Sequence, residues 1–433
     1  MPKKTTLPNG IRVLSDRVAG VRSVSVGVWA AVGSRDETAG QGGLAHLIEH
    51  MMFKGTTRRS ARVIAETIDA TGGMLDAYTT KEATAYYARV LDEHMPVALD
   101  LLADMLINST FAEEELAREK EVVLEEISMA EDMPEDLVHE LFDAHVFAGH
   151  PLARPILGTR ESVAGHTRED ILRFVGRHYT PANLVIAAAG SVDHGRLVDE
   201  AARLFGGMSG PEPPRRVTRP LAYTPGRVAV EKDTEQVHVC VGGPGLRRAD
   251  PRRFAMHLLD TIVGGGLSSR LFQQLRENRG LVYSTYSFVA SYTETGVFGV
   301  YAATRPERVE EVLEVIGREL GEMAAGGIRE EDVDRAREHA KGSLMLALEN
   351  TATRVGRLAG AELWREPYLS PGELIDRIER VSVQDVRALA DELFAPERLS
   401  VVMLGPVAAE KPAPVRRAAA AGRRREAARE AMG

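Results

Sequence analysis

Three side chains able to bind or activate a ligand form a His-x-x-Glu-His pattern at His46, Glu49 and His50. On a helix, residues three and four positions apart share one face, so two imidazoles and a carboxylate would project into one small volume. Histidines one turn apart can bind Zn²⁺, and a neighbouring carboxylate can take a proton from metal-bound water, whose pKa falls from about 15.7 to about 7. The pattern indicates metal-assisted hydrolysis, with His46 and His50 as ligands and Glu49 as general base. The alternative is a surface helix whose histidines and acid are simply solvated, or histidines that are hydrogen-bonded within a core.

A catalytic zinc site needs a third protein ligand, and an acid-rich segment downstream offers one. Residues Phe111 to Met129 have the spacing of an amphipathic helix. Glu119 and Glu126 are seven residues apart, which places them on the same face, so one could coordinate the metal while the other supports it. The only cysteine, Cys240, excludes both an internal disulfide and a site built from several thiolates.

The elements that must position these residues occur twice in the chain. With 433 residues, of which 44% are hydrophobic, the chain is long enough for two cores. Residues 170–190 match residues 385–405 at an offset of 215, each as a helix that ends near a proline and is followed by a buried strand. We therefore expect two homologous halves that close with the same unit.

The two halves also begin alike, although their chemistry differs. Alternating valines predict a strand near residues 24–28 and another near residues 237–241, each followed by a helix. The first helix holds the three candidate residues, whereas residues 257–266 have lost them. A proline-rich stretch separates the halves. We predict a metal-binding domain at 1–210, a linker at 211–225, a domain without metal ligands at 226–408 and a basic, disordered or singly helical tail at 409–433.

The composition and the N-terminal sequence indicate which partners the protein binds and in which cellular compartment it is found. The N-terminus lacks the apolar stretch of a signal peptide, and no run approaches a membrane span, so we expect a cytoplasmic protein without membrane contact. The formal net charge of the chain is -9. Because the C-terminal tail is basic, the rest of the chain is more acidic than this total indicates. An acidic body argues against nucleic-acid binding.

With these residues the chain resembles the insulysin and pitrilysin zinc peptidases, whose inverted His-x-x-Glu-His motif has a Glu ligand roughly seventy-five residues later. Glu126 lies 76 residues beyond His50. The resemblance implies that Glu126 is the third zinc ligand and that Glu119 assists as a supporting acid. Residues 72–82 and 149–158 are also similar to family stretches, so the resemblance covers nearly the whole chain except the tail.

The resemblance further implies the fold and a contribution from the second half. We expect two tandem α+β domains, each a mostly antiparallel sheet flanked by helices, which together form a clam-shell half-chamber. Arg276 and Tyr283 match the family's Arg/Tyr pair. A guanidinium can bind a substrate carbonyl or carboxylate, and a phenol can donate to the oxyanion formed during attack on a peptide.

One position departs from the family pattern. Asp76 stands where many relatives have Asn in the strand that receives substrate. An ionised carboxylate cannot donate a hydrogen bond to a substrate carbonyl. We expect main-chain pairing by Ala77 and its neighbours instead, with Asp76 favouring a basic substrate residue.

The sequence therefore predicts a zinc metalloendopeptidase that takes extended peptides or unstructured polypeptide segments. The alternatives are a structural or assembly protein on the same fold and a metal-dependent protein that captures peptides without cutting them. Chain length resembles that of the mitochondrial processing peptidases and their bacterial counterparts, which work as dimers. We expect a homodimer, or else a heterodimer with a related subunit, with one zinc ion per chain.

Overall fold

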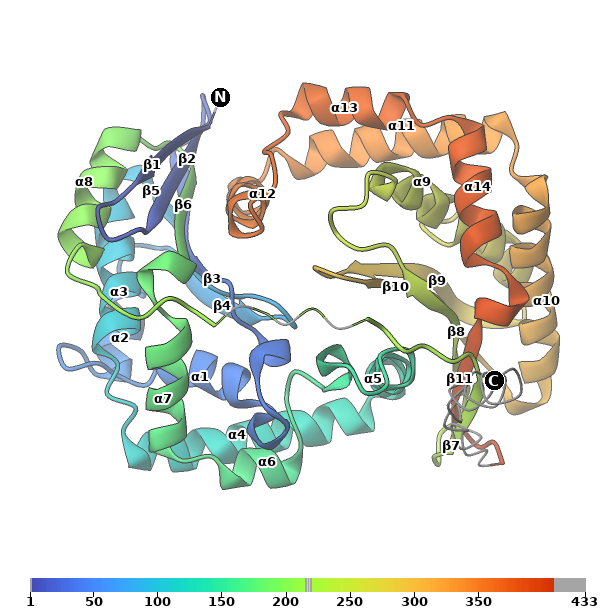
Figure 1. Cartoon of the computed structure of the whole chain (residues 1–433), viewed down its shortest axis with the longest axis horizontal. Coiled ribbons are helices and arrows are strands. Elements are labelled where there is room, and N and C mark those ends of the chain that lie inside the picture. The colour runs from blue at the N-terminus through green and yellow to red at the C-terminus, as the bar shows by residue number, and fades with distance from the viewer. Residues whose placement is uncertain (1, 215, 217, 219, 409–433) are drawn as a thin grey trace, which may run out of the picture.

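Two β-sheets, one in each half of the sequence, organise this computed structural model, which describes residues 2–214, 216, 218 and 220–408 (Figure 1). The first sheet has the order β1-β2-β6-β3-β5-β4, with strands β1 (Lys3–Thr6), β2 (Arg12–Arg17), β3 (Ser23–Ala30), β4 (Met74–Thr79), β5 (Thr84–Leu91) and β6 (Leu184–Gly190). The second has the order β7-β11-β8-β10-β9, with strands β7 (Arg227–Glu231), β8 (Val237–Gly245), β9 (Val282–Ser291), β10 (Gly296–Thr304) and β11 (Ser400–Gly405). The tail at 409–433 lies outside the described residues.

Within the described strands, neighbours pair antiparallel except at one place in each sheet. β2 runs parallel to β6, and β7 runs parallel to β11. In both sheets a parallel strand lies beside the closing strand of its half, and the first sheet carries the additional strand β1 beyond it. The α+β class and the mostly antiparallel sheets expected from the sequence are confirmed.

Helices follow the same order in both halves. The first half contains α1 (Leu44–Met52), α2 (Ala61–Asp69), α3 (Met95–Asn108), α4 (Glu113–Asp132), α5 (Pro134–Val146), α6 (Arg160–Gly165), α7 (Arg168–His178) and α8 (His194–Phe205). The second contains α9 (Arg253–Val263), the π-helix η6 (Phe272–Glu277), α10 (Val309–Glu322), α11 (Glu330–Ala347), α12 (Thr351–Leu363), α13 (Pro371–Glu379) and α14 (Val383–Leu393). The repeat of 215 residues corresponds to α7 followed by β6 and to α14 followed by β11, with Pro181 and Pro396 opening the short connections.

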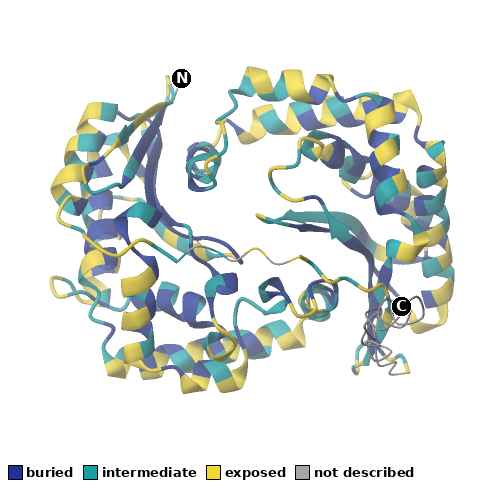
Figure 2. Ribbon diagram, viewed as in Figure 1, coloured by how far each residue is buried: buried dark blue, intermediate teal, exposed yellow. Residues whose placement is uncertain are grey.

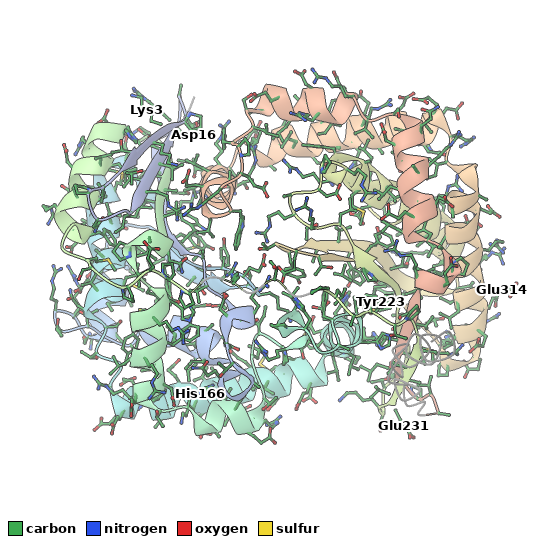
Figure 3. The ribbon with its side chains drawn as sticks, viewed as in Figure 1. Lys3, Asp16, His166, Tyr223, Glu231 and Glu314 are labelled. Carbon is green, nitrogen blue, oxygen red and sulfur yellow. The ribbon has the colours of Figure 1, made fainter. Side chains whose placement is uncertain are left out.

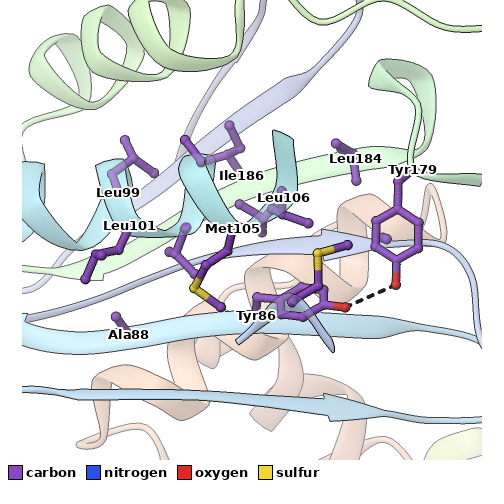
Figure 4. Close-up of a cluster of buried hydrophobic side chains, with 14 of the residues drawn as sticks. Tyr86, Ala88, Leu99, Leu101, Met105, Leu106, Tyr179, Leu184 and Ile186 are labelled. Atoms are coloured by element: carbon purple, nitrogen blue, oxygen red, sulfur yellow. Dashed lines mark hydrogen bonds between the residues drawn. The ribbon is translucent and has the colours of Figure 1, made fainter. Parts of the chain in front are cut away.

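Each sheet buries one face beneath the helices of its own half. In the first half, the alternate residues of β3 and β5 pack against α1 and α3. Figure 4 shows part of this cluster, in which the buried hydroxyls of Tyr86 and Tyr179 are hydrogen-bonded to each other at 3.3 Å. The central strands β3 and β6 are largely buried, whereas the outer faces of the helices are exposed, as Figure 2 shows. This core holds the helix that bears the His-x-x-Glu-His pattern.

The other face of each sheet is covered by a helix from the opposite half. Helix α12 packs across β6, β3 and β2 of the first sheet, and α5 packs on β8 and β11 of the second (Figure 1). Val355 and Leu358 of α12 join a cluster with Trp29, while Val138 and Phe142 of α5 join a cluster of second-sheet residues. The halves are therefore joined by exchanged helices as well as by the linker.

Buried charges reinforce this junction. Arg35, which follows β3, pairs with both Glu82 and Glu294, and the second-half Arg248 binds Glu82 at 2.6 Å. At the end of the linker, the Tyr223 hydroxyl donates to the carbonyl of Arg398 at 2.8 Å (Figure 3). The arginine–glutamate pairs fix the β4–β5 turn against the β9–β10 turn, and the Tyr223 contact holds the linker against the second half.

Candidate metal centre

Helix α1 presents three polar side chains because its opposite face is buried in the first core. Leu44, Leu47, Ile48, Met51 and Met52 have no exposed surface, which leaves His46, Glu49 and His50 on the remaining face. The sequence prediction of a helix with these three residues together is borne out by this arrangement.

The start of α1 depends on a backbone position that only glycine fits easily. Gly43 precedes the helix with a φ of 81°, and a Cβ there would lie 2.4 Å from the carbonyl oxygen of Leu157. The Nε2–H of His166 donates to the carbonyl of the adjacent Gly42 at 2.9 Å (Figure 3). The turn before the metal-binding helix is therefore held by the loop that precedes α7.

A buried acid binds the first amides of α1. The Glu37 carboxylate accepts hydrogen bonds from the N–H groups of Gly43 at 3.2 Å and Ala45 at 2.8 Å. It therefore satisfies two of the amide groups that a helix N-terminus leaves unpaired. Burial raises the pKa of Glu37 to about 8, although both backbone hydrogen bonds oppose that shift.

The third candidate ligand comes from α4, which packs against α1. Leu116, Val123 and Ile127 anchor one face of α4 in the core. Glu119 lies on the buried side, and Glu126 lies at the edge of that face. The two acids were expected on one face, and the structure brings both to the histidine pair.

Three ligand atoms converge on one point between α1 and α4. Glu126 Oε2 lies 3.7 Å from His46 Nε2 and 3.6 Å from His50 Nε2. Ligand atoms around a tetrahedral Zn²⁺ are about 3.4 Å apart, so this separation suits a metal ion. Glu126 Oε2 is buried and has no hydrogen-bond partner. Among the described residues, these three form the one group of acids, histidines or cysteines with this convergence.

Of the two histidines, His46 is buried in an environment that keeps its imidazole neutral. Burial, together with the nearby His50, lowers the pKa of His46 to about 4. A neutral imidazole keeps a free lone pair at neutral pH, which metal binding requires. The observed donor set therefore fits zinc.

Glu119 holds one of the two imidazoles from behind. The Nδ1–H of His50 donates to Glu119 Oε2 at 3.1 Å, which directs Nε2 toward Glu126. Lys54, four residues beyond His50, pairs with the other Glu119 oxygen at 2.7 Å. Such a carboxylate fixes the tautomer and orientation of a metal-binding histidine, and the lysine supplies the compensating charge.

Glu49 is held next to this group by a residue of the edge strand. The Thr79 hydroxyl of β4 donates to Glu49 Oε2. Burial raises the pKa of Glu49, although the Thr79 hydrogen bond opposes the shift. We call the three candidate ligands His46, His50 and Glu126 the metal cluster. An acid with a raised pKa beside such a group is suited to accept and return a proton.

Strand β4, the strand predicted to receive substrate, forms one edge of the first sheet. The side chains of Leu75, Ala77 and Thr79 face α1 and the core, whereas Asp76 lies on the opposite, exposed side. The Asp76 carboxylate accepts hydrogen bonds from the Ala77 N–H at 2.8 Å and the Tyr87 hydroxyl at 3.1 Å. Asp76 is thus engaged with its own strand and the neighbouring one.

The Arg/Tyr pair lies in the second half, away from the metal cluster. Arg276 of η6 stacks 5.3 Å from the ring of Tyr283, which is 76% exposed. Among the described residues, no hydrogen bond, ion pair or ring contact joins either of them to the residues of the metal cluster. The structure brings the two together but does not bring them to the histidines of the same chain.

Sequence reasoning did not assign roles to Glu37, Lys54 and Thr79. The position of Lys54, one turn after His50, is a weak signal that could have suggested a partner for a nearby acid. Glu37 and Thr79 become functional only through the packing of a loop and a strand against α1. No local pattern marks them.

The chain is similar to known proteins over most of its length. Residues 12–160 match the family described as Insulinase (Peptidase family M16), and residues 166–339 match the one described as Peptidase M16 inactive domain. A Streptomyces coelicolor protein named as an uncharacterized zinc protease is 43% identical over 414 residues, which cover 94% of this chain and 90% of the relative. The uncharacterized zinc protease YmxG of Bacillus subtilis is 39% identical, with coverage of 94% and 98%.

Solved structures show the same fold. A structure described as a peptidase M16 inactive domain from Pseudomonas fluorescens has a TM-score of 0.89 at 23% identity and covers 95% of this chain and 99% of its own. A Helicobacter pylori protease has a TM-score of 0.88 at 22% identity, with coverage of 94% and 99%.

The two matched regions and the named relatives define a class of zinc proteases. The chain belongs to the M16 family of insulinase- and pitrilysin-type proteases. The resemblance inferred from the sequence is confirmed. Within the described part of the chain, no helix has the length and apolar character needed to cross a membrane.

Proposed function

We propose that this protein is a zinc-dependent metalloendopeptidase that hydrolyses extended peptides or unstructured polypeptide segments. The observation that carries the proposal is the convergence of two imidazole nitrogens with a buried carboxylate oxygen that has no hydrogen-bond partner. His46, His50 and Glu126 would hold the ion. When bound, zinc would supply Lewis acidity and lower the pKa of a water ligand to about 7.

Glu49 would carry the proton. Its carboxylate lies on the same helix face as the ligands and is fixed by Thr79, so it can accept a proton from the attacking water. The protonated acid would then deliver that proton to the nitrogen of the leaving amine. Glu119 and Lys54 would keep His50 oriented throughout.

The open edge of β4 would bind the substrate. An extended peptide can add to a sheet edge through main-chain hydrogen bonds. Because these bonds do not involve its side chains, binding depends only weakly on the peptide sequence. Thr79 of this strand contacts Glu49, so a peptide paired with β4 would run beside the proton carrier. This arrangement favours unfolded segments over folded proteins.

We further propose a cytoplasmic homodimer in which Arg276 and Tyr283 serve the metal site of the partner chain. Their exposure, and their lack of contact with the metal cluster of the same chain, support this arrangement. Mixing Glu49→Gln with Tyr283→Phe should restore part of the cleavage that each variant lacks. A monomer by light scattering that retains full activity would contradict the dimer.

The decisive experiment compares the wild type with Glu49→Gln on unstructured peptides, with and without a chelator. We expect the variant to retain zinc and lose cleavage, because only the proton carrier is removed. Asp69→Asn, on the exposed end of α2, is the matched control and should cleave normally. Equal cleavage by Glu49→Gln would eliminate this mechanism, and peptide binding without cleavage by the wild type would favour a peptide-capturing protein.

A further inference from the structure

The main chain of β4 presents a hydrogen-bond donor to the open edge at Ala77. The N–H of Thr80 donates to the Ala83 carbonyl across the turn that joins β4 to β5. Ladder hydrogen bonds in an antiparallel pair fall on alternate residues, so Tyr78 and Asp76 also bond to β5. The N–H groups of Leu75, Ala77 and Thr79 therefore point away from β5, toward the side where a substrate strand would lie.

One of these three donors is already occupied. Asp76 Oδ1 accepts the Ala77 N–H at 2.8 Å, while no side-chain acceptor among the described residues meets the N–H of Leu75 or Thr79. The other oxygen, Asp76 Oδ2, accepts the hydroxyl of Tyr87 on β5 at 3.1 Å. The carboxylate is thus held in place over the edge by two donors.

We propose that Asp76 covers the Ala77 amide and competes with the substrate backbone for it, which sets the affinity of the edge strand for extended peptides. The inference rests on the proposed addition of a substrate strand to β4. A peptide carbonyl that pairs with Ala77 must first displace a charged acceptor, which binds an N–H more strongly than a neutral carbonyl does. Only peptides with enough other contacts along the edge would bind productively.

The same contact protects the free protein. An exposed edge strand is a template for pairing with any other chain, and natural proteins blunt such edges with charges. At Asp76 the charge occupies the donor itself. Asp76 therefore acts as a specificity-determining residue rather than as a residue that touches the reacting bond.

The hydrogen bond between Asp76 and the Ala77 amide can be tested without substrate by amide hydrogen exchange on the full-length protein. After correction for intrinsic rates, the Ala77 amide should exchange more slowly than those of Leu75 and Thr79. Replacement Asp76→Ala should speed it about tenfold, and Asp76→Asn should have an intermediate effect because an amide oxygen is a weaker acceptor. Equal exchange at Ala77 in the wild type and in Asp76→Ala overturns the proposal.

The competition is tested by peptide binding in the Glu49→Gln background, which removes cleavage from the measurement. A short, blocked, uncharged fluorescent peptide should bind about fivefold more tightly when Asp76→Ala is added. Asp69→Asn is the control for net charge and should leave binding unchanged. If the Ala77 amide exchanges slowly but Asp76→Ala leaves peptide binding unchanged or weaker, the inference about Asp76 is wrong and the proposed function still stands. No peptide binding to any variant overturns the inference together with the proposed function.

Discussion

Helices α1 and α9 occupy the same position in the two halves, yet only α1 bears a metal cluster. His46, Glu49 and His50 correspond in order to His257, Asp260 and Thr261. In both halves the central acid binds a hydroxyl of the edge strand. Thr79 of β4 donates to Glu49, and Ser287 of β9 donates to Asp260 at 2.6 Å. The pair of acid and hydroxyl therefore belongs to the shared scaffold, and the catalytic use of Glu49 builds on it.

The difference between the halves lies in the ligands and in the helix that supplies the third one. Glu126 is the fourteenth residue of α4, and the fourteenth residue of α11 is Ser343. Thr261, which replaces the second histidine, donates its hydroxyl to the carbonyl of His257 within its own helix. The second half keeps the architecture and one histidine but lacks the other two ligand side chains, so the candidate metal site depends on a few residues.

The largest expected effect comes from removing the third ligand. Glu126→Gln should weaken zinc binding by more than about a hundredfold, because a neutral amide replaces the only carboxylate among the three ligand groups. Its neighbour Glu125 is exposed on the same helix, and Glu125→Gln should bind zinc like the wild type. Competition with a chromogenic chelator measures both. Equal affinities would remove the distinction between the halves.

A smaller effect should follow from the charge behind His50. Lys54→Gln leaves the nearly buried Glu119 without its cation and disturbs the hydrogen bond to the imidazole, so zinc affinity should fall about tenfold. Lys54→Arg keeps the charge and should restore most of the affinity. The nitrogen chemical shifts of His50 report its tautomer in the metal-free protein. An unchanged tautomer and unchanged affinity in Lys54→Gln would show that the lysine only packs there.

The sequence predicted the parts of this site that depend on local periodicity. The spacing of His46, Glu49 and His50 specifies one face of a helix, and the family resemblance selected Glu126 over the adjacent Glu125. The sequence could not predict the hydrogen-bond partners that tertiary packing brings to these residues. Thr79 reaches Glu49 because β4 lies against α1. Asp76 turns to its own strand because the N–H of Ala77 points to the open edge and has no acceptor on β5. The exchange of α5 and α12 between the sheets depends on tertiary contacts that periodicity does not encode.

The two pairs of acid and hydroxyl should respond differently to loss of the hydroxyl. Thr79→Val should lower cleavage severalfold with zinc retained, because Glu49 loses the donor that fixes it. Ser287→Ala should lower the free energy of unfolding by about 1 kcal/mol and leave cleavage and zinc binding unchanged. Peptide assays and urea titrations distinguish these outcomes. Equal losses of activity in both variants would refute a purely structural role for the second pair.

The acids at the starts of α1 and α9 should have opposite effects on pH stability. Burial raises the pKa of the Glu37 carboxyl to about 8. In contrast, hydrogen bonds from the side chain and the backbone N–H of Arg252, the latter at 2.8 Å, lower the pKa of Asp250. For Glu37 the folded pKa exceeds the unfolded one, so its contribution to stability is complete below about pH 4.5 and is lost as the pH rises through about 8. For Asp250 the contribution is present above the unfolded value of 3.8 and is lost as the pH falls through the lowered folded pKa.

Substituting each acid with its amide should therefore change the two ends of the pH range. Glu37→Gln carries no charge at any pH, so it should lose less stability than the wild type between about pH 5 and about pH 9. Asp250→Asn should be less stable than the wild type at neutral pH, and this deficit should shrink below about pH 3.8. Urea unfolding across the range measures both. A parallel pH dependence in Glu37→Gln and the wild type would mean that Glu37 is ionised throughout, and the start of the metal-binding helix would then be held by a charge rather than by a buried neutral acid.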